Sequence, residues 1–562
     1  MRRSLLITLA VLVCGFLLSP SATAQTINGS ISGLVTDANG AAVAGAMVTA
    51  THMETGQSRD ATTNDEGLYR ISSLGIGSYS VKIEKAGFGA VTESTQVSSG
   101  ADTTINFKLS AGSLTAQVEV TDTGAILETT QSQVIKTVDR RRILSLPGRN
   151  SLNGLALLNP GVLPNQNGRP GSGFAVNGNR SRSNNFTIDG ANNNDQSLSI
   201  PRQNLPSEAI GEFQIITNTF AAEYGRNSGS YVNQITRSGT NEFHGTGFWA
   251  WQGNGLDALT TNQQRNFNAL RASNPNLTDK EVLRRVRGVT VDTIYGFTLG
   301  GPIAKNHTFF FTSVDLNYIR QTVSSVTRAA LTAESRALLL ANRGAFASPG
   351  AVDFLLNTFP ASNDPTLPGG TLAGSQVVAR NAAGNPVTGN TATSTVTFNT
   401  FNRTQGAGIP YGTNFGRWLG KINTKINSKD QLSVRYLYDR FEDPGAPASL
   451  PGLEIGTLVR NDSFTVNDVY IISSNLINEA RFTYSRREIA FPENLDAFTN
   501  GSQLSVTGAL SAFNGGNANF PQNRLDNVFE WTDNVAYTTG NHALKFGYNL
   551  LRYDLNSVFA PN

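Results

Sequence analysis

Residues 430–441 read DQLSVRYLYDRF, and the alternation of side chains along this stretch decides the fold class. Leu432 and Val434 fall on one face of an extended chain, and Ser433 and Arg435 fall on the other, because successive side chains of a strand point to opposite faces. An apolar face opposite a polar face is what a wall between lipid and a wet lumen requires. The stretch therefore predicts one strand of a transmembrane β-barrel.

The same alternation recurs through the part of the chain that follows Gly239. In residues 542–554, for example, Leu544 and Phe546 oppose Lys545 and Gly547. Each such segment has roughly the ~10 residues that cross a membrane as a tilted strand. The nine predicted strands lie near residues 242–251, 293–303, 307–319, 414–426, 430–441, 462–473, 475–487, 527–538 and 542–554.

The connections between these segments alternate in length. Short turns are predicted at residues 305–306, 427–429, 473–474 and 539–541, and long loops at residues 252–292, 320–413, 442–461 and 488–526. Short periplasmic turns and long external loops are typical of outer-membrane barrels. Trp249, Trp251, Trp418 and Trp531 fall on or beside the strands, where an interfacial aromatic girdle and a core position are both open interpretations.

Nine strands are too few to complete the predicted barrel. An open sheet edge in lipid would leave backbone groups unpaired, at several kcal/mol each. The chain also ends in FAPN, without the terminal aromatic strand that families of this kind use for assembly. We therefore expect residues 241–562 to be a partial barrel and the chain to be the N-terminal portion of a longer protein.

The chain begins with the pattern of a secretory signal peptide. Arg2 and Arg3 precede an apolar run from Leu5 to Leu18, and small residues up to Ala24 follow it. The run is shorter than the ~20 residues of a membrane-spanning helix. We expect residues 1–24 to be removed and the mature chain to begin at Gln25.

Cysteine and charge usage exclude several classes of protein. Cys14 is the single cysteine and lies in the signal segment, so the mature chain has no thiol for a disulfide, a zinc–cysteine site or a nucleophile. Lipidation at Cys14 is an alternative, although the bulky Val13 before it is unusual for such a signal. The 44 basic and 41 acidic residues nearly cancel, which argues against nucleic-acid binding.

No catalytic constellation is present in the sequence. The four histidines are scattered, and no HExxH, phosphate loop or GxSxG elbow occurs. The sequence therefore predicts a protein that is not an enzyme and that needs no cofactor or metal.

Residues 25–112 are predicted to form a small antiparallel sandwich, because short β segments alternate there with turn signals. The stretches GLVTDANGAAVAGAMV (33–48) and TTNDEGLYRISSLGIGSYSVKIEKAGF (62–88) resemble the carboxypeptidase regulatory-like domain, which implies a seven-stranded, transthyretin-like fold. Gly40 and Gly67 follow Asn39 and Glu66 in turns expected to need positive φ. The predicted strands are Ile31–Thr36, Ala46–His52, Gly67–Ile71, Tyr79–Lys85 and Thr103–Leu109.

Two roles are open for this sandwich. Related folds can bind carbohydrate, but there is no exposed tryptophan platform, and Tyr69 and Tyr79 are expected in the core. The better-supported role is a spacer or docking module.

Residues 113–138 are predicted to be a linker. Its segment VEVTDTG resembles the TonB box, through which an inner-membrane energy-coupling protein pulls on TonB-dependent transporters. Such a box works by strand addition, so its sequence is loosely specified. Val118, Glu119, Val120 and Thr121 are the candidate box, with an ordinary linker strand as the alternative.

Residues 139–240 carry the most specific resemblance. The blocks DRRRILSLPGRNSLNGLALLNPGV (139–162), FAVNGNRSRSNNFTIDGANNND (174–195) and PSEAIGEFQIITNTFAAEYGRNSGSYVNQITRSGTNEFHG (206–245) look like the plug of Oar-like TonB-dependent proteins. The resemblance implies an α+β plug inside the barrel, whose polar side chains bond to a polar inner wall. The expected plug-to-wall contacts are Arg180, Arg182, Asp189 and Arg226.

The residues of the plug also predict local structure. Asn150 is positioned to cap a short helix through Leu158, and residues 174–176 and 186–188 alternate as strands. Ile210, Phe213 and Ile215 predict one more buried strand.

The acidic loop from Asp189 to Asp195 has two interpretations. Its spacing lacks the alternating ligands and the final glutamate of an EF-hand loop, so calcium is the weaker one. A solvated turn is the expectation.

The sequence as a whole predicts a β-dominated outer-membrane receptor or transporter of Gram-negative type: a periplasmic sandwich, a plug and the first strands of a large barrel. The resemblance implies import of a bulky solute (a glycan, peptide or metal chelate), with a TonB-type coupling protein and outer-membrane lipid as partners. A structural or adhesive outer-membrane protein is the alternative function. A working coupling segment near Val118 would favour import.

Overall fold

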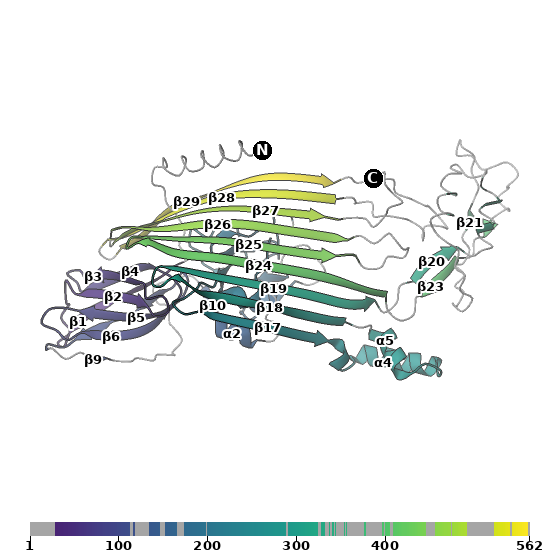
Figure 1. The fold of residues 1–562 in the computed structure, drawn as a ribbon, viewed down its shortest axis with the longest axis horizontal. Helices are drawn as coiled ribbons and strands as arrows, with labels where there is room; N and C mark the ends of the chain where they lie inside the picture. The colour runs from purple at the N-terminus through teal and green to yellow at the C-terminus, as the bar shows by residue number, and fades with distance from the viewer. Residues whose placement is uncertain are drawn as a thin grey trace.

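The computed structural model describes most of the chain. The described residues are 28–112, 116–117, 134–146, 152–165, 173–197, 199–287, 290–323, 327–331, 409–445, 456–473, 475–491, 522–539 and 542–559, with short pieces between residues 336 and 404. Long strands form a curved wall, and the N-terminal sandwich lies at the end of that wall where the short turns are (Figure 1). Among the described residues, no helix is long and apolar enough to cross a membrane.

The sandwich consists of two sheets around one apolar core. One sheet has the order β4-β1-β7, with β8 also paired to β1, and the other has the order β3-β2-β5-β6-β9. The core includes Tyr69 and Tyr79, as expected, together with Ile31, Val81 and Phe107. The strands are β1 (Gly29–Asp37), β2 (Met47–His52), β3 (Ser58–Thr62), β4 (Leu68–Leu74), β5 (Gly77–Glu84), β6 (Val91–Val97), β7 (Asp102–Thr104), β8 (Phe107–Leu109) and β9 (Ala116–Gln117).

The sandwich differs from its sequence prediction in four places, one of which is β9, two residues of the predicted linker that pair with β6. β3 and β6 are not predicted, because they carry mostly polar side chains and bury few of them. The single strand predicted at residues 103–109 is divided into β7 and β8, because the side chain of Asn106 accepts the hydrogen bond from the backbone N–H of Leu34 on β1. Gly40 and Gly67 have φ of 88° and 76°, as their turns require.

The plug is a five-stranded sheet with short helices. Its strand order is β10-β15-β16-β13-β14, and β13 runs parallel to β16. β10 comes from within the predicted linker and pairs with β15. The elements are β10 (Val134–Asp139), α2 (Arg140–Ser145), α3 (Leu152–Ala156), β11 (Val162–Pro164), β12 (Phe174–Val176), β13 (Asn185–Ile188), β14 (Ala191–Asn192), the 3-10 helix η1 (Ser207–Ala209), β15 (Ile210–Asn218) and β16 (Tyr231–Thr236).

The predicted strands of the plug are confirmed, and its predicted helix is shorter than expected. Ile210, Phe213 and Ile215 are buried on β15. The helix ends before Leu158 because the side-chain amide of Asn159 donates to the carbonyls of Leu155 and Ala156, at 3.3 and 3.0 Å. Asn150, the expected cap, lies outside the described residues.

The wall is a nine-stranded antiparallel sheet in which each strand pairs with the next one along the chain. All nine strands were predicted, but most are longer, up to 19 residues in β24, so they extend beyond the span of lipid. The edge strands β17 and β29 do not pair with each other, so the sheet is open. The strands are β17 (His244–Gly253), β18 (Thr290–Ala304), β19 (Thr308–Val323), β24 (Ile409–Asn427), β25 (Asp430–Asp443), β26 (Thr457–Ser473), β27 (Leu476–Ala490), β28 (Gln522–Thr539) and β29 (His542–Phe559).

Two of the predicted loops contain structure of their own. Residues 252–292 hold the 3-10 helix η2 (Asn254–Leu256) and two helices, α4 (Thr261–Ser273) and α5 (Asp279–Arg287). Capping boxes at Thr260 with Gln263 and at Thr278 with Glu281 begin the two helices. Residues 320–413 hold the short pairs β20 (Thr327–Leu331) with β23 (Thr400–Thr404), and β21 (Gln376–Val377) with β22 (Val396–Thr397).

The core of the plug continues into the wall. Phe174, Phe186 and Phe213 belong to the same buried cluster as the wall residues Phe311, Leu419 and Leu437. The inner face of the wall is therefore not polar throughout, because apolar side chains meet the plug where its core reaches the strands.

Candidate functional site

Asp189 lies at the centre of the contact between plug and wall. Its buried carboxylate accepts hydrogen bonds from the backbone N–H and the hydroxyl of Thr236, at 2.8 and 2.6 Å. A guanidinium nitrogen of Arg435 on β25 lies 2.6 Å from the same carboxylate, and Nζ of Lys421 on β24 lies 3.8 Å away. Two wall cations thus compensate one buried plug anion.

The electrostatics favour the ionised form of Asp189. Burial alone raises the pKa of this carboxyl, but the charges of Lys421 and Arg435 and the hydrogen bonds from Thr236 outweigh it and lower the pKa below its ordinary value. Asp189 has a φ of 48°, a left-handed conformation that a short polar side chain tolerates.

The expectation of a solvated turn from Asp189 to Asp195 is wrong. Asp195 is also buried and forms an ion pair with Arg487 of β27. The backbone N–H of Asn192 donates to Glu530 of β28 at 2.8 Å. The partners are distant in sequence, since Arg435 is 246 residues away from Asp189, so the local spacing gives no sign of them. Within the described residues, no three His, Cys, Asp or Glu side chains gather closely enough to hold a metal ion.

The other three predicted contact residues differ in their positions. The guanidinium of Arg226 donates to the hydroxyl of Tyr553 on β29 at 2.9 Å and lies over its ring. Arg180 and Arg182 are exposed. The structure therefore brings Asp189 and Arg226 to the wall and leaves the other two at the surface of the plug. A plug-anchoring role for all four stays a prediction.

Sequence reasoning misses Lys421 and Arg487. Lys421 pairs in register with Arg435, and Arg487 lies on the inward-facing side of β27 with Arg481. An inward cation on a predicted barrel strand is the signal that could have identified them.

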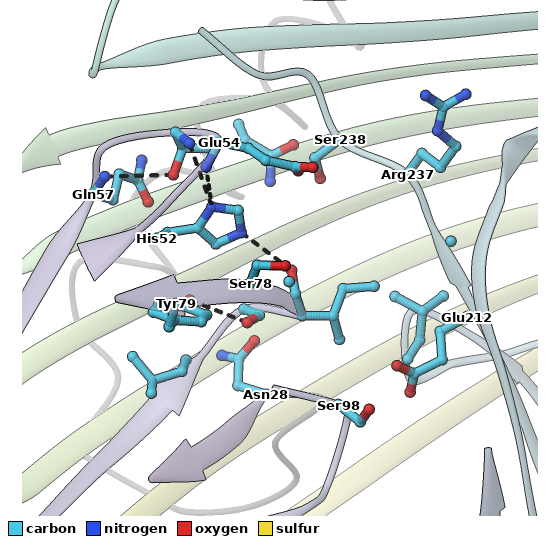
Figure 2. A pocket seen from close by; sticks show the side chains of 18 of the residues that line it. Asn28, His52, Glu54, Gln57, Ser78, Tyr79, Ser98, Glu212, Arg237 and Ser238 are labelled. Carbon is cyan, nitrogen blue, oxygen red and sulfur yellow. Dashed lines mark hydrogen bonds between the residues drawn. The ribbon is translucent and has the colours of Figure 1, made fainter. Parts of the chain in front are cut away.

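A cavity of about 1460 Å³ lies between the sandwich, the plug and the wall strands β24 to β26. Figure 2 shows its sandwich side, where His52 Nε2 is 3.3 Å from the carbonyl oxygen of Ile76 and Nδ1 accepts from the backbone N–H of Glu54. Burial lowers the pKa of His52, so the neutral ring is favoured. Asp189 and Arg435 also line this cavity, which places the plug anchor within it.

Glu212 of β15 forms part of the plug side of the cavity. Burial raises its pKa to about 7, although a backbone hydrogen bond from Ser99 of the sandwich opposes the shift. The carboxyl therefore changes its charge close to neutral pH, at the place where the two domains touch.

Comparison with known proteins assigns the family. The family model described as "Outer membrane beta barrel domain" matches residues 235–562, the "TonB-dependent Receptor Plug Domain" matches residues 127–230, and the "Carboxypeptidase regulatory-like domain" matches residues 30–110. The TonB-dependent transporter Oar of Myxococcus xanthus is 29% identical over 321 residues, which are 55% of this chain and 28% of that protein. The chain belongs to the Oar-like TonB-dependent receptors. The receptor is accordingly a Gram-negative outer-membrane protein.

Solved structures similar to this receptor include two outer-membrane proteins. The outer membrane transporter YddB from Escherichia coli has a TM-score of 0.49 at 10% identity, covering 75% of this chain and 48% of that one. A variant of the ferric enterobactin receptor PfeA from Pseudomonas aeruginosa has a TM-score of 0.41 at 11% identity, and the match covers 75% of this chain and 49% of that one. The receptor chain thus spans about half the length of these two and 28% of Oar.

Two predicted sites of the receptor lie outside the described residues. These are the candidate TonB box from Val118 to Thr121 and the cleavage site between Ala24 and Gln25. Directly before the candidate box, Ala116 and Gln117 pair in parallel with Val91 and Thr92 of β6. Both sites stay predictions.

Proposed function

We propose that this receptor imports a bulky solute across the outer membrane, driven by a TonB-type energy-coupling protein, and that it has no enzymatic activity. The observation that carries the proposal is the buried anchoring of the plug to the wall by Asp189, Arg435 and Lys421. Separating one partner of a buried ion pair costs about 3–5 kcal/mol. A plug held in this way needs external work before a large solute can pass.

The arrangement of the two ends of the wall supports a direction of transport. The sandwich lies at the end with the short turns, and the helices α4 and α5 lie at the opposite end with the long loops (Figure 1). Short turns are periplasmic in such barrels, and long loops are external. We infer that the long loops capture the solute, which is a glycan, a peptide or a metal chelate, and that the sandwich faces the periplasm.

The coupling partner is proposed to bind Val118 to Thr121 by strand addition. This segment follows the sandwich and precedes β10 of the plug, so a pull on it is transmitted directly to the plug sheet. We propose domains at residues 25–112 for the sandwich, 113–138 for the linker, 139–240 for the plug and 241–562 for the partial barrel, with β10 at the end of the linker already part of the plug sheet.

A cysteine cross-linking experiment tests the coupling step without knowledge of the solute. Val120→Cys in the full-length protein should form a disulfide with a cysteine in the pairing strand of the coupling protein. Lys108→Cys, an exposed site on β8, is the matched control and should not cross-link. Equal cross-linking at both positions, or none at Val120, would contradict the proposed box and favour a structural or adhesive role.

A further inference from the structure

The sandwich is docked directly on the plug sheet. The backbone N–H of Ser99 donates to Glu212 at 3.1 Å, and the side-chain amide of Gln214 donates to the carbonyl of Ser99 at 2.7 Å. All three residues are buried, so these hydrogen bonds are shielded from water. Buried polar groups are costly to leave unpaired, and the two bonds therefore favour the docked position.

A second contact joins the sandwich to a turn of the wall. The backbone N–H of Asn241 donates to the carbonyl of Glu54 at 3.0 Å, and the side chain of Asn241 is bonded in turn to Asn306 in the β18–β19 turn. Gly56 of the sandwich approaches so closely that an added Cβ would lie 2.5 Å from Oδ1 of Asn306.

The cavity of about 1460 Å³ is lined by residues from both contacts, and the sandwich forms one side of it. The lining is rich in polar and charged side chains, among them Arg59, Ser73, Asn423 and Asn467. Buried polar groups are generally satisfied by protein or by water. A cavity of this size with such a lining is therefore filled with water or with the polar groups of a solute.

We propose that the sandwich is a periplasmic gate: docked, it partly closes a hydrated vestibule between itself, the plug and the inner wall, and it must leave the plug before a large polar solute can pass to the periplasm. The role of this gate depends on the proposed import function. The geometry that supports it, the two contacts and the cavity, does not depend on that function. Because the vestibule reaches Asp189, a solute released when the plug moves would enter it directly.

Thiol labelling of the vestibule tests the gate. Ser433 on β25 lines the cavity, and Ser433→Cys changes its size little. The variant is made in the full-length protein freed of other thiols and reconstituted in nanodiscs. Two probes are compared: a small charged methanethiosulfonate reagent and a maleimide carried on a long polyethylene glycol chain. The docked protein should react readily with the small reagent and slowly with the large one.

Undocking should open the vestibule to the large reagent. The double variant Glu212→Ala with Gln214→Ala loses the buried hydrogen bonds. The rate at which the large reagent labels position 433 should then rise by about tenfold, and the rate for the small reagent should stay within about twofold of its docked value. Lys136→Ala, at an exposed site on β10, is the matched control and should change neither rate. Asn306→Ala removes the Oδ1 that holds the side chain of Asn241, which weakens the second contact and should act in the same direction. This variant keeps the test valid if the double variant fails to assemble.

Two outcomes would overturn the gate. If the large reagent labels position 433 equally fast in docked and undocked proteins, the sandwich does not close the vestibule. If the small reagent labels neither, the cavity is not hydrated. Both labelling rates are measured without solute uptake. A failure of the proposed import function can therefore be distinguished from a failure of the gate.

Discussion

At the scale of the residue, the charge of Asp189 and its wall partners determines how firmly the plug is held. The carboxylate forms ion pairs with Arg435 and Lys421, which are themselves buried. The sequence predicted that Asp189 meets the wall, because the plug resemblance and the polar lumen implied it. It could not predict which cations pair with it, since the register of β24 and β25 against the plug depends on the folded barrel.

Asp189→Ala should weaken plug anchoring. The substitution leaves two buried cations without their counter-ion, at a cost of about 3–5 kcal/mol. Urea unfolding of the plug in the full-length protein, followed by a fluorophore on the plug, should show an earlier transition. Lys136→Ala, at an exposed site on β10, is the control. An unchanged transition in Asp189→Ala would mean that the ion pairs do not anchor the plug.

Glu212 should make docking of the sandwich depend on pH. Because burial raises its pKa from 4.5 to about 7, docking favours the protonated carboxyl. Its contribution to docking is greatest at acid pH and is lost as the pH rises through about 7. Asp139 of β10 adds to the upward shift, the bonds from Ser98 and Ser99 oppose it, and Arg140 and Arg237 line the same cavity. His52 across the cavity has a lowered pKa, so it changes charge below this window.

Distances between spin labels at the exposed sites Lys108 and Lys305 measure this effect. The docked distance should dominate at pH 6 and become less populated at pH 8, and Glu212→Gln should remove the difference. A population that is independent of pH in the unsubstituted protein would contradict the assignment.

At the scale of the element, strand alternation was sufficient to place all nine wall strands and to predict the facing sides of β25 and β29. Phe546 is exposed on the outer face, and Lys545 lies 3.5 Å from Glu223 of the plug, as the pattern of polar and apolar residues requires. The elements that sequence reasoning missed lack such a pattern. β3 and β6 carry mostly polar side chains, and α4 buries none of its residues. The sequence did carry one sign of α4 and α5, which is the capping-box pattern at the start of each helix.

Phe546→Arg should destabilise the assembled barrel, because it places a charge on the lipid-facing side. An arginine there should cost roughly 2–4 kcal/mol if the site lies near the membrane midplane. Lys545→Gln, the inward neighbour, should cost little. The fraction of full-length protein that resists heat in gel migration reports assembly. Equal losses from both substitutions would mean that the register of β29 is wrong by one residue.

At the scale of the whole molecule, three units meet around one cavity, and this arrangement could not be read from the sequence. The family resemblance supplied the sandwich, the plug and the barrel separately. Their contact depends on short surface segments such as Ser98 to Gly100 and the turn at Asn306, whose local sequence indicates only a turn. Docking is therefore a property of the folded units and not of any motif.

A disulfide that fixes the sandwich to the wall should block passage. The added Cβ of Gly56 would lie 3.4 Å from Cγ of Asn306, the place that the sulfur of Asn306→Cys would take, so a disulfide to Gly56→Cys is within reach despite the positive φ of residue 56. Oxidised cells should lose growth on a nutrient that depends on this receptor, and a reductant should restore it. Met47→Cys with Thr62→Cys, paired positions on β2 and β3, is the control that binds the sandwich only to itself. Normal growth of the oxidised Gly56–Asn306 variant would contradict a gate that has to move.

The central claim is energised import, and growth on defined nutrients measures it most directly. Strains that lack the whole receptor, that lack only Val118 to Thr121, or that lack the coupling protein are compared on a panel of glycans, peptides and metal chelates as limiting nutrients. We expect the receptor deletion to abolish growth on at least one of them, and the two coupling defects to abolish growth on the same one while the shortened receptor still assembles and binds it. Normal growth of the shortened-receptor strain on a nutrient that the receptor deletion loses would contradict the account.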